Sequence, residues 1–119
     1  MTEKVDLLQK NCVPCEGIGK ALTIQEAQEY LKEINSWQLD PSGKLIRREY
    51  VLKNFLAGIQ LMTKIAQVAE AENHHPDLHL TGYRKLRVEL TTHALGGLSE
   101  NDFILAAKIN QLPAELKNV

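Results

Sequence analysis

The strongest pattern along the chain lies between Asn54 and Asn73, where apolar residues recur every three or four positions. This spacing places them on one face of a helix. Asn54 can cap the start of the helix, and Pro76 forbids its continuation. The positions that we expect to face the core are Phe55, Ile59, Met62, Ala66 and Ala69, with Leu56, Ile65 and Val68 widening the stripe.

Two more helices are predicted where capping residues precede apolar residues at helical spacing. The run Thr23-Ile24-Gln25-Glu26 has the form of a capping box, and the helix that it opens is expected to run to about Asn35. The run Ser99-Glu100-Asn101-Asp102 opens the last helix, which Pro113 ends. Residues 1–20 lack periodicity, so we expect an N-terminal arm laid over the fold, with residues 21–119 forming a single domain.

Polar and apolar residues alternate in two segments, which is typical of strands with one buried face. The runs 37–39 and 45–52 flank the turn formers Asp40-Pro41-Ser42-Gly43 and predict a first hairpin. Leucines and a valine alternate with polar residues around Gly82-Tyr83-Arg84 and predict a second. The order α-β-β-α-β-β-α predicts an α+β fold in which a four-stranded antiparallel sheet carries three helices packed on one face.

Composition restricts the class of protein further. The chain has 119 residues, which suits one domain. Its 14 basic and 15 acidic residues give a net charge of −1, so the basic excess that favours nucleic-acid binding is missing. No apolar run reaches the roughly 18 residues of a membrane span, and charges stand near the start where a signal peptide is apolar. We therefore expect a cytoplasmic protein with neither nucleic acid nor a membrane as a direct partner.

The two cysteines, Cys12 and Cys15, form a Cys-Val-Pro-Cys run. Such a pair can be half of a zinc site or a redox pair. Zinc would need two more ligands from distant parts of the chain, and thioredoxin-like chemistry needs a βαβ setting that the predicted elements lack. We expect two half-buried thiols in the arm, with no functional metal and no obligatory disulfide.

All four histidines, His74, His75, His79 and His93, fall within one short window. Each alone is typical of a surface or turn residue, but their clustering indicates a shared cause. His74 and His75 occupy the turn after the main helix, and His93 follows the last strand. Because loops and strand ends carry most functional sites and imidazole exchanges protons near neutral pH, the cluster predicts a site for proton transfer.

Zinc binding is the first alternative, since His75 and His79 are spaced as two ligands on one helix face would be. Pro76 and Gly82 leave this segment too short for a stable helix, and the Leu-His-Leu-Thr alternation favours a strand. No glutamate follows His75 to act as the base of a metalloprotease. A nucleophilic site is weaker still, because neither Cys12 nor a serine lies near a histidine in sequence.

A longer pattern joins these residues. It consists of Glu70-x-x-x-His74-His75-Pro76, Tyr83, Thr92-His93 and Gly97-Leu98-Ser99-x-x-Asp102, and it resembles the signature of the pterin-4a-carbinolamine dehydratases. The resemblance also covers Lys53-Asn54-Phe55, the last helix and the Cys-x-x-Cys leader of bacterial members. Nearly the whole chain is therefore similar to this family.

The resemblance implies dehydration of 4a-hydroxytetrahydropterin, in its biopterin form, to the quinonoid dihydropterin. That step recycles the cofactor of aromatic amino acid hydroxylases, so such a hydroxylase is an implied partner, while no metal or bound cofactor is implied. The catalytic residues implied are His74, His75, His93 and Asp102, and those implied to bind the pterin are Glu70, Asn73, Pro76 and Thr92. Animal members have Asp where this chain has Asn73, and an aromatic residue where it has Leu78.

The chemistry agrees with these residues, because loss of water from C4a needs one proton delivered to the hydroxyl and another removed from N5. His74 and His93 come from separate elements, so we expect them to transfer the protons and His75 to hold the ring. Asp102 has two interpretations, since a carboxylate in the first turn also stabilises a helix; orientation of a histidine is its expected contribution. Glu70 has less structural reason to stand at a helix C-terminal end.

Two alternatives to this enzyme remain open. One is a binding module, because animal members also act as dimerisation cofactors for a homeodomain transcription factor. The other is a dehydratase for a different pterin, such as one of molybdopterin metabolism. In each case we expect self-association, because the sheet leaves edges that are usually paired or protected, and the resemblance implies dimers or tetramers.

Overall fold

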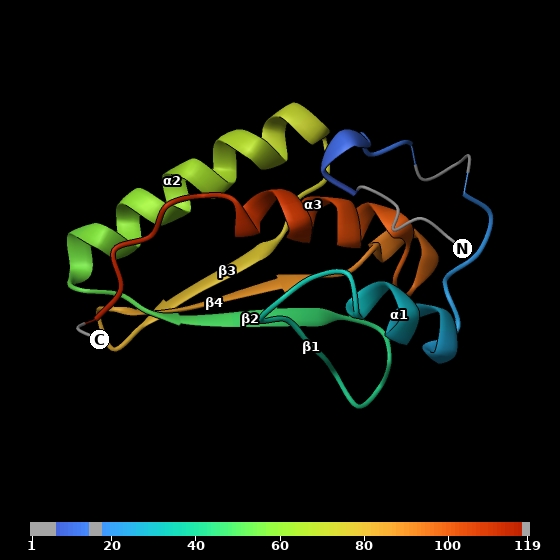
Figure 1. The fold of residues 1–119 in the computed structure, drawn as a ribbon, viewed down its shortest axis with the longest axis horizontal. Helices are drawn as coiled ribbons and strands as arrows, with labels where there is room; N and C mark the ends of the chain where they lie inside the picture. Colours follow the sequence, from blue (N-terminus) through green and yellow to red (C-terminus); the bar gives the residue numbers. More distant parts are fainter. Residues whose placement is uncertain (1–6, 15–17, 118–119) are drawn as a thin grey trace.

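The predicted order of elements is confirmed by the structure, a computed structural model that describes residues 7–14 and 18–117. The expectations for the first six residues and for Cys15 lie outside the described residues. The strands are β1 (Gln38–Leu39), β2 (Ile46–Val51), β3 (Asp77–Thr81) and β4 (Lys85–Leu90). The helices are α1 (Ile24–Leu31), α2 (Phe55–Glu72) and α3 (Glu100–Asn110), with 3-10 turns η1 (Leu7–Gln9) and η3 (His93–Leu95) (Figure 1).

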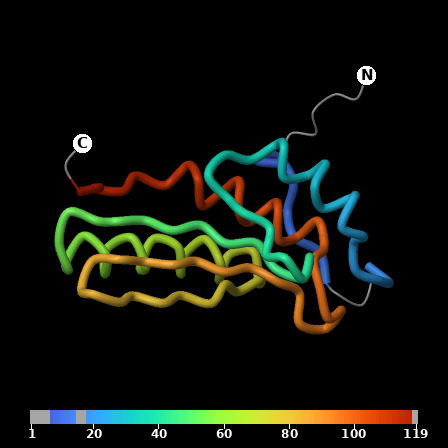
Figure 2. Tube along the Cα trace, turned by 90° about the horizontal axis from the view of Figure 1, so that it is seen from below, coloured from blue at the N-terminus to red at the C-terminus, as the bar shows by residue number. Residues whose placement is uncertain are grey.

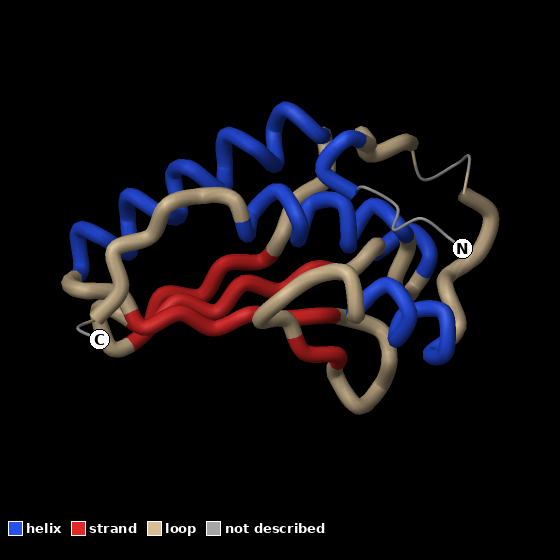
Figure 3. Tube along the Cα trace, viewed as in Figure 1, coloured by secondary structure: helices blue, strands red, loops and turns tan. Residues whose placement is uncertain are grey.

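The four strands form one antiparallel sheet in the order β1-β2-β4-β3 (Figure 3). Pairing of β2 with β4 joins the two hairpins, so that Leu86 lies between Tyr50 on one side and Leu80 on the other. Leu86, Val88 and Leu90 are buried, as the alternation predicts. The fold therefore has the expected α+β class.

The helices form a layer over one face of this sheet. Helices α2 and α3 lie across the strands, and α1 lies at the end of the layer (Figure 1, Figure 2). The ring of Tyr30 in α1 stacks on Phe103 in α3, with ring centroids 5.1 Å apart. None of the helices in the described ranges is long and apolar enough to cross a membrane.

The opposite face of the sheet is charged. Arg87 Nε lies 3.5 Å from Glu49 Oε2, and Arg87 Nη1 lies 3.4 Å from Glu89 Oε2. His79 Nε2 lies 3.2 Å from Glu89 Oε1 on the same face. Alternate strand residues point to opposite sides, so these side chains point away from the helices. A face of this composition is stable in contact with water.

Helix α2 lies within the predicted bounds, but the face that it buries matches the expectation only in part: Ile65 and Ala69 are buried as expected, and Met62 and Val68 are half-buried against the core. The expected core positions that are exposed instead are Phe55, Leu56, Ile59 and Ala66. The buried positions are Ala57, Gly58, Leu61, Ile65 and Ala69. Because the helix is apolar around most of its circumference, its periodicity allows two faces. The face with small residues lies closest to the sheet, where a Cβ on Gly58 would stand 3.1 Å from Leu80 Cδ1.

Helix α1 begins as predicted and ends earlier. The capping box is confirmed, since Thr23 Oγ1 accepts a hydrogen bond from the Glu26 N–H and Glu26 Oε1 accepts one from the Thr23 N–H. The helix ends at Leu31, before the predicted Asn35. Beyond it the chain turns, and Ser36 has a left-handed φ of 74°. That conformation cannot continue a right-handed helix.

Candidate active site

The predicted site residues gather at one end of the sheet, where α2 ends, β3 begins, β4 ends and α3 begins (Figure 1). Asn73 ends α2 in the left-handed conformation, with a φ of 53°. Asparagine adopts this conformation more readily than most residues. Pro76 then directs the chain into β3. His74 and His75 therefore stand in a tight turn between a helix and a strand.

His74 and Asp102 form a buried pair at this end. The Nε2 atom of His74 lies 2.7 Å from Oδ1 of Asp102, and the two side chains are 9% and 0% exposed. When Asp102 is the hydrogen-bond acceptor, Nε2 is the protonated ring nitrogen and donates the hydrogen bond. Within residues 7–14 and 18–117, no other hydrogen bond reaches this ring. Nδ1 is the ring atom left for proton exchange.

Asp102 is held by three segments of the chain. Its Oδ2 atom accepts hydrogen bonds from the Ser99 main-chain N–H at 2.9 Å and from the Thr92 hydroxyl at 2.8 Å. The Thr92 hydroxyl has a single proton, so the Ser99 hydroxyl, 2.8 Å away, donates to Thr92. Asp102 therefore caps α3 through Ser99 and is hydrogen-bonded to His74 as well, so the geometry is compatible with both interpretations.

A second carboxylate–imidazole pair lies at the surface. His75 Nε2 is 2.7 Å from Glu70 Oε2, and the two side chains are 54% and 76% exposed. Glu70 belongs to the last turn of α2, so this pair spans the turn that carries His74. His75 and Glu70 are therefore both accessible from solvent at this turn.

His93 is exposed and is the first residue of η3, directly after Thr92. Its loop is closed by a main-chain hydrogen bond of 2.8 Å from the Thr92 N–H to the Gly97 carbonyl. The Thr92 side chain binds Asp102, so the loop that carries His93 is attached to the buried pair.

The remaining histidine lies apart from this site. His79 is bound to Glu89 on the charged face of the sheet, whereas His75 is bound to Glu70. The two rings that could pair as zinc ligands are therefore engaged by different carboxylates. Among the residues that the structure describes, no group of three or more His, Cys, Asp or Glu side chains is arranged to hold a metal ion. Ser99 belongs to the sequence pattern but is not among the predicted site residues, and its hydroxyl lies 2.8 Å from that of Thr92 in this network.

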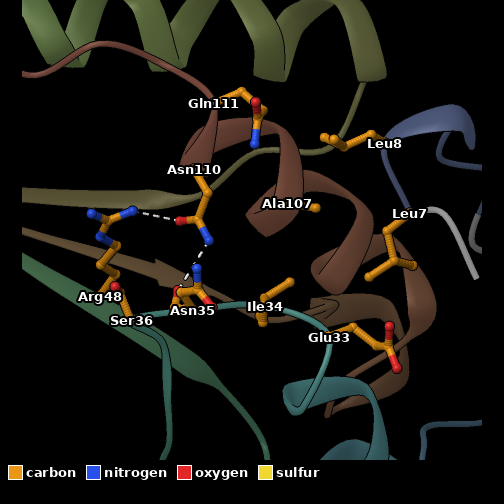
Figure 4. A pocket seen from close by; sticks show the side chains of 10 residues that line it. All are labelled: Leu7, Leu8, Glu33, Ile34, Asn35, Ser36, Arg48, Ala107, Asn110 and Gln111. Carbon is orange, nitrogen blue, oxygen red and sulfur yellow. Dashed lines mark hydrogen bonds between the residues drawn. The ribbon is translucent and has the colours of Figure 1, made fainter. Parts of the chain in front are cut away.

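A cavity of about 530 Å³ lies elsewhere, near the C-terminal end of α3 (Figure 4). Asn110 organises its wall, since Oδ1 accepts hydrogen bonds from the Arg48 guanidinium and the Trp37 indole, and Nδ2 donates to the Asn35 carbonyl. No histidine lines this cavity. It offers no imidazole for proton transfer, so the chemistry is assigned to the end of the sheet that carries His74.

Fold and site define a class: an α+β protein with a carboxylate-oriented histidine at the end of its sheet, suited to proton transfer. Residues 20–112 match the family described as pterin 4 alpha carbinolamine dehydratase. The chain belongs to this family, as its sequence pattern predicts.

Relatives with this activity in their names are similar over most of the chain. Pterin-4-alpha-carbinolamine dehydratase 2, mitochondrial, of Arabidopsis thaliana is 46% identical over 113 residues, which are 92% of this chain and 60% of the plant protein. The chain therefore spans less than two thirds of that relative. A provisionally named pterin-4-alpha-carbinolamine dehydratase of Halorhodospira halophila is 41% identical over 110 residues, which are 92% of this chain and 100% of that protein.

Two solved structures have a similar fold. One, described as a transcriptional coactivator/pterin dehydratase from Brucella melitensis, has a TM-score of 0.70 and 32% identity, covering 76% of this chain and 96% of that one. The other, a pterin dehydratase-like protein described as a RuBisCO assembly factor in the alpha-carboxysome, has a TM-score of 0.53 and 16% identity, covering 64% and 87%. The second shares the fold alone.

Proposed function

We propose that the chain is a dehydratase that converts 4a-hydroxytetrahydropterin, in its biopterin form, to the quinonoid dihydropterin and water. The C4a–O bond breaks as the hydroxyl receives a proton, and N5 loses a proton as the C4a–N5 double bond forms. The observation that carries the proposal is the buried His74–Asp102 pair, with His75 and His93 in the adjoining turns. Membership of the family supports the substrate class.

His74 is assigned to one of the two proton transfers. Asp102 Oδ1 accepts a hydrogen bond from the Nε2–H of His74, which fixes both the direction of the ring and its tautomer. Proton exchange therefore takes place at Nδ1. A positioned acid or base contributes roughly 10²–10⁴-fold to a rate.

His93 is assigned to the other proton transfer. It comes from the loop after β4, whereas His74 comes from the turn after α2, so the two imidazoles can address two atoms of one ring. One must begin protonated and the other neutral, because the reaction consumes a proton at the hydroxyl and releases one at N5. Exchange with solvent then restores both rings, and the proton count balances over each turnover.

The neighbouring residues are assigned to the pterin and to the buried pair. Those on the pterin side are Glu70, Asn73, His75 and Pro76. Thr92 has a different role from the one that the resemblance implies. It is 1% exposed and its hydroxyl binds Asp102, so we assign it to holding the carboxylate.

A stopped-flow assay with chemically generated 4a-hydroxytetrahydropterin tests this function. The wild type should remove the substrate faster than buffer does, and His74→Gln should abolish the acceleration, since glutamine keeps a donor for Asp102 but exchanges no proton. His79→Gln is the matched control, because His79 is bound to Glu89 on the charged sheet face. A wild type no faster than buffer rejects the enzyme in favour of a binding module. Full activity of folded His74→Gln rejects the site.

The choice of pterin is tested in the same assay. Biopterin carries a short polar side chain on the ring, whereas pterins of molybdopterin metabolism carry other groups there. A higher kcat/KM for the biopterin substrate supports the proposed physiological role. A higher kcat/KM for the other pterins favours the alternative of a dehydratase that acts in molybdopterin metabolism.

The protein is also proposed to self-associate as a dimer or tetramer. Phe55, Leu56 and Ile59 of α2 are 54%, 61% and 38% exposed. Grouped apolar side chains in contact with water are unfavourable and often mark an interface. Strand β3 is also an edge of the sheet, with main-chain groups that a second copy can pair.

A further inference from the structure

The N-terminal arm, described over residues 7–14, crosses the junction between the end of α2 and the start of α3 (Figure 1). It is attached to Asn101, the residue before Asp102, which is 2% exposed. Asn101 Oδ1 accepts a hydrogen bond of 3.0 Å from the Val13 N–H, and Asn101 Nδ2 donates one of 2.8 Å to the Val13 carbonyl. The side-chain amide therefore pairs with the main chain of Val13 in both directions, as a neighbouring strand would.

The same stretch of the arm is attached to Glu72, the last residue of α2. Glu72 Oε1 accepts a hydrogen bond of 2.8 Å from the Cys12 N–H, and Oε2 accepts one of 2.6 Å from Lys108 Nζ in α3. Burial alone would raise the pKa of Glu72, but the hydrogen bonds from Lys108 and Cys12 outweigh it and hold that pKa below its ordinary value. The ionised carboxylate thus ties α2, α3 and the arm together at neutral pH.

The two residues that hold the arm, Asn101 and Glu72, are close in sequence to the two members of the buried His74–Asp102 pair. Asn101 directly precedes Asp102, and Glu72 lies just before the turn that carries His74. The 2.7 Å contact between His74 and Asp102 crosses the same junction. A change in the separation of the two helix ends therefore changes this contact directly. The match to the family model begins at residue 20, so the described part of the arm precedes the residues that this model covers.

We propose that Asn101 is a positioning residue for the dehydration: by clamping Val13 over the junction of α2 and α3, it sets the geometry of His74 and Asp102. This inference rests on the proposed dehydratase function. Both polar groups of the Asn101 side chain are used by Val13, so it acts through its neighbours and touches no reacting atom. Displacement of a catalytic group by about 1 Å can lower a rate by roughly 10²-fold.

Asn101→Ala removes both hydrogen bonds to Val13 and tests the clamp in the stopped-flow assay. We expect kcat to fall by about 10-fold to 10²-fold, with KM changed by less than about 2-fold, because the contacts to the pterin stay in place. Lys10→Ala is the matched control, because it removes the exposed 2.7 Å ion pair of the arm with Glu100 and leaves the clamp intact. Wild-type kcat in folded Asn101→Ala, or an equal loss in Lys10→Ala, overturns the proposal.

A variant in the arm separates the clamp from the folding of α3. Val13→Pro removes the main-chain N–H that donates a hydrogen bond to Asn101 Oδ1, and it leaves every residue of α3 and of the site unchanged. It should lower kcat in the same direction as Asn101→Ala, with KM again unchanged. Loss of activity in Asn101→Ala alone would assign the effect to α3 and reject the arm as its cause.

A spectroscopic measurement without substrate separates the clamp from the proposed function. The Nε2 proton of His74, buried and bound to Asp102, should give a slowly exchanging NMR signal in the wild type. Asn101→Ala should shift this signal and speed its exchange by at least about tenfold, whereas Lys10→Ala should leave it unchanged. A wild type that is inactive on the pterin rejects the function. An unchanged His74 signal in Asn101→Ala rejects the clamp.

Discussion

His74 and Asp102 are 28 residues apart in the sequence, yet Nε2 of one lies 2.7 Å from Oδ1 of the other. The contact joins the turn after α2 to the first turn of α3, so it forms only when both helices are packed on the sheet. Asp102 is fully buried, and hydrogen bonds from His74, Thr92 and Ser99 replace the water around its charge. Loss of one partner leaves a buried charge uncompensated, so we expect this carboxylate to contribute to stability as well as to the proposed reaction.

Asp102→Asn should weaken both contributions. The side chain keeps its size, but the new NH₂ group meets either the His74 donor or the Ser99 donor, and the charge that orients the ring is lost. We expect kcat to fall by about 10²-fold or more, and the free energy of unfolding to fall by about 1–3 kcal/mol. Stopped-flow kinetics and chemical denaturation measure the two effects. Asp77→Asn, at an exposed carboxylate in β3, should change neither. Near wild-type kcat in folded Asp102→Asn would contradict the assigned role.

The three site histidines should differ in their kinetic effects. His74→Gln and His93→Ala should each lower kcat by roughly 10²–10⁴-fold, as loss of an acid–base partner does. His75→Ala should chiefly raise KM, because that ring is assigned to hold the pterin. The rate should also fall on both sides of neutrality, since one imidazole begins protonated and the other neutral. Kinetics across a pH series measures all of these. Small, equal losses of kcat in the three folded variants would place the chemistry elsewhere.

The position of the site can be predicted from the sequence because its residues stand where the periodic pattern of one helix ends or that of another begins. Asn73 and Pro76 mark the end of a helix and Ser99 marks the start of another, and local backbone rules set both positions. The sharing of the Thr92 hydroxyl between Asp102 and Ser99 leaves no such mark, because it depends on contacts between segments that only the fold brings together.

The buried face of α2 is harder to predict than the position of the site, because it depends on which side chains fit against the sheet. Large apolar residues dominate a periodicity argument, and Phe55 and Ile59 therefore favour the face that proves to be exposed. Ala57 and Gly58 are buried, and a Cβ on Gly58 would stand only 3.1 Å from Leu80 Cδ1, so the sheet lies close to this face of the helix. Small residues carry little weight in such a pattern, although close packing requires them.

A charge placed on the exposed apolar surface of α2 should dissociate the proposed dimer or tetramer, and light scattering should then give a lower molar mass. The wild type is expected to scatter light as a dimer or tetramer of the 13.4 kDa chain. Ile59→Glu should shift the mass toward the monomer at micromolar concentration, because an unpaired carboxylate in an apolar interface is costly to bury. Gln60→Glu adds the same charge at the next exposed position and should have a smaller effect. A wild-type mass near 13.4 kDa refutes self-association.

Cys12 should be an unreactive thiol while the arm is attached. Burial and the charge of Glu72 raise the pKa of this thiol to about 12, although Lys108 opposes the shift. A thiol that stays protonated is a poor nucleophile. In a Cys15→Ser background, an aromatic disulfide reagent at about pH 8 should modify Cys12 roughly 10³-fold more slowly in the folded protein than in guanidinium. Equal rates in the two states would show that the arm does not protect it.

The same pKa determines how the thiol affects stability at alkaline pH. Its ordinary pKa is 9.0 and its pKa in the folded protein is about 12, so the unfolded chain releases the proton first. The contribution of Cys12 to the free energy of unfolding is therefore complete below the ordinary value and is lost as the pH rises toward the folded value. The thermal midpoint of the Cys15→Ser protein should fall between about pH 8 and about pH 10.5. With Cys12→Ser added, the midpoint should fall less over the same range, because the buried ionisable group is gone. If the thermal midpoints of the two proteins fall by the same amount over this pH range, Cys12 is already in contact with solvent in the folded state. The arm would then detach from α3 without global unfolding.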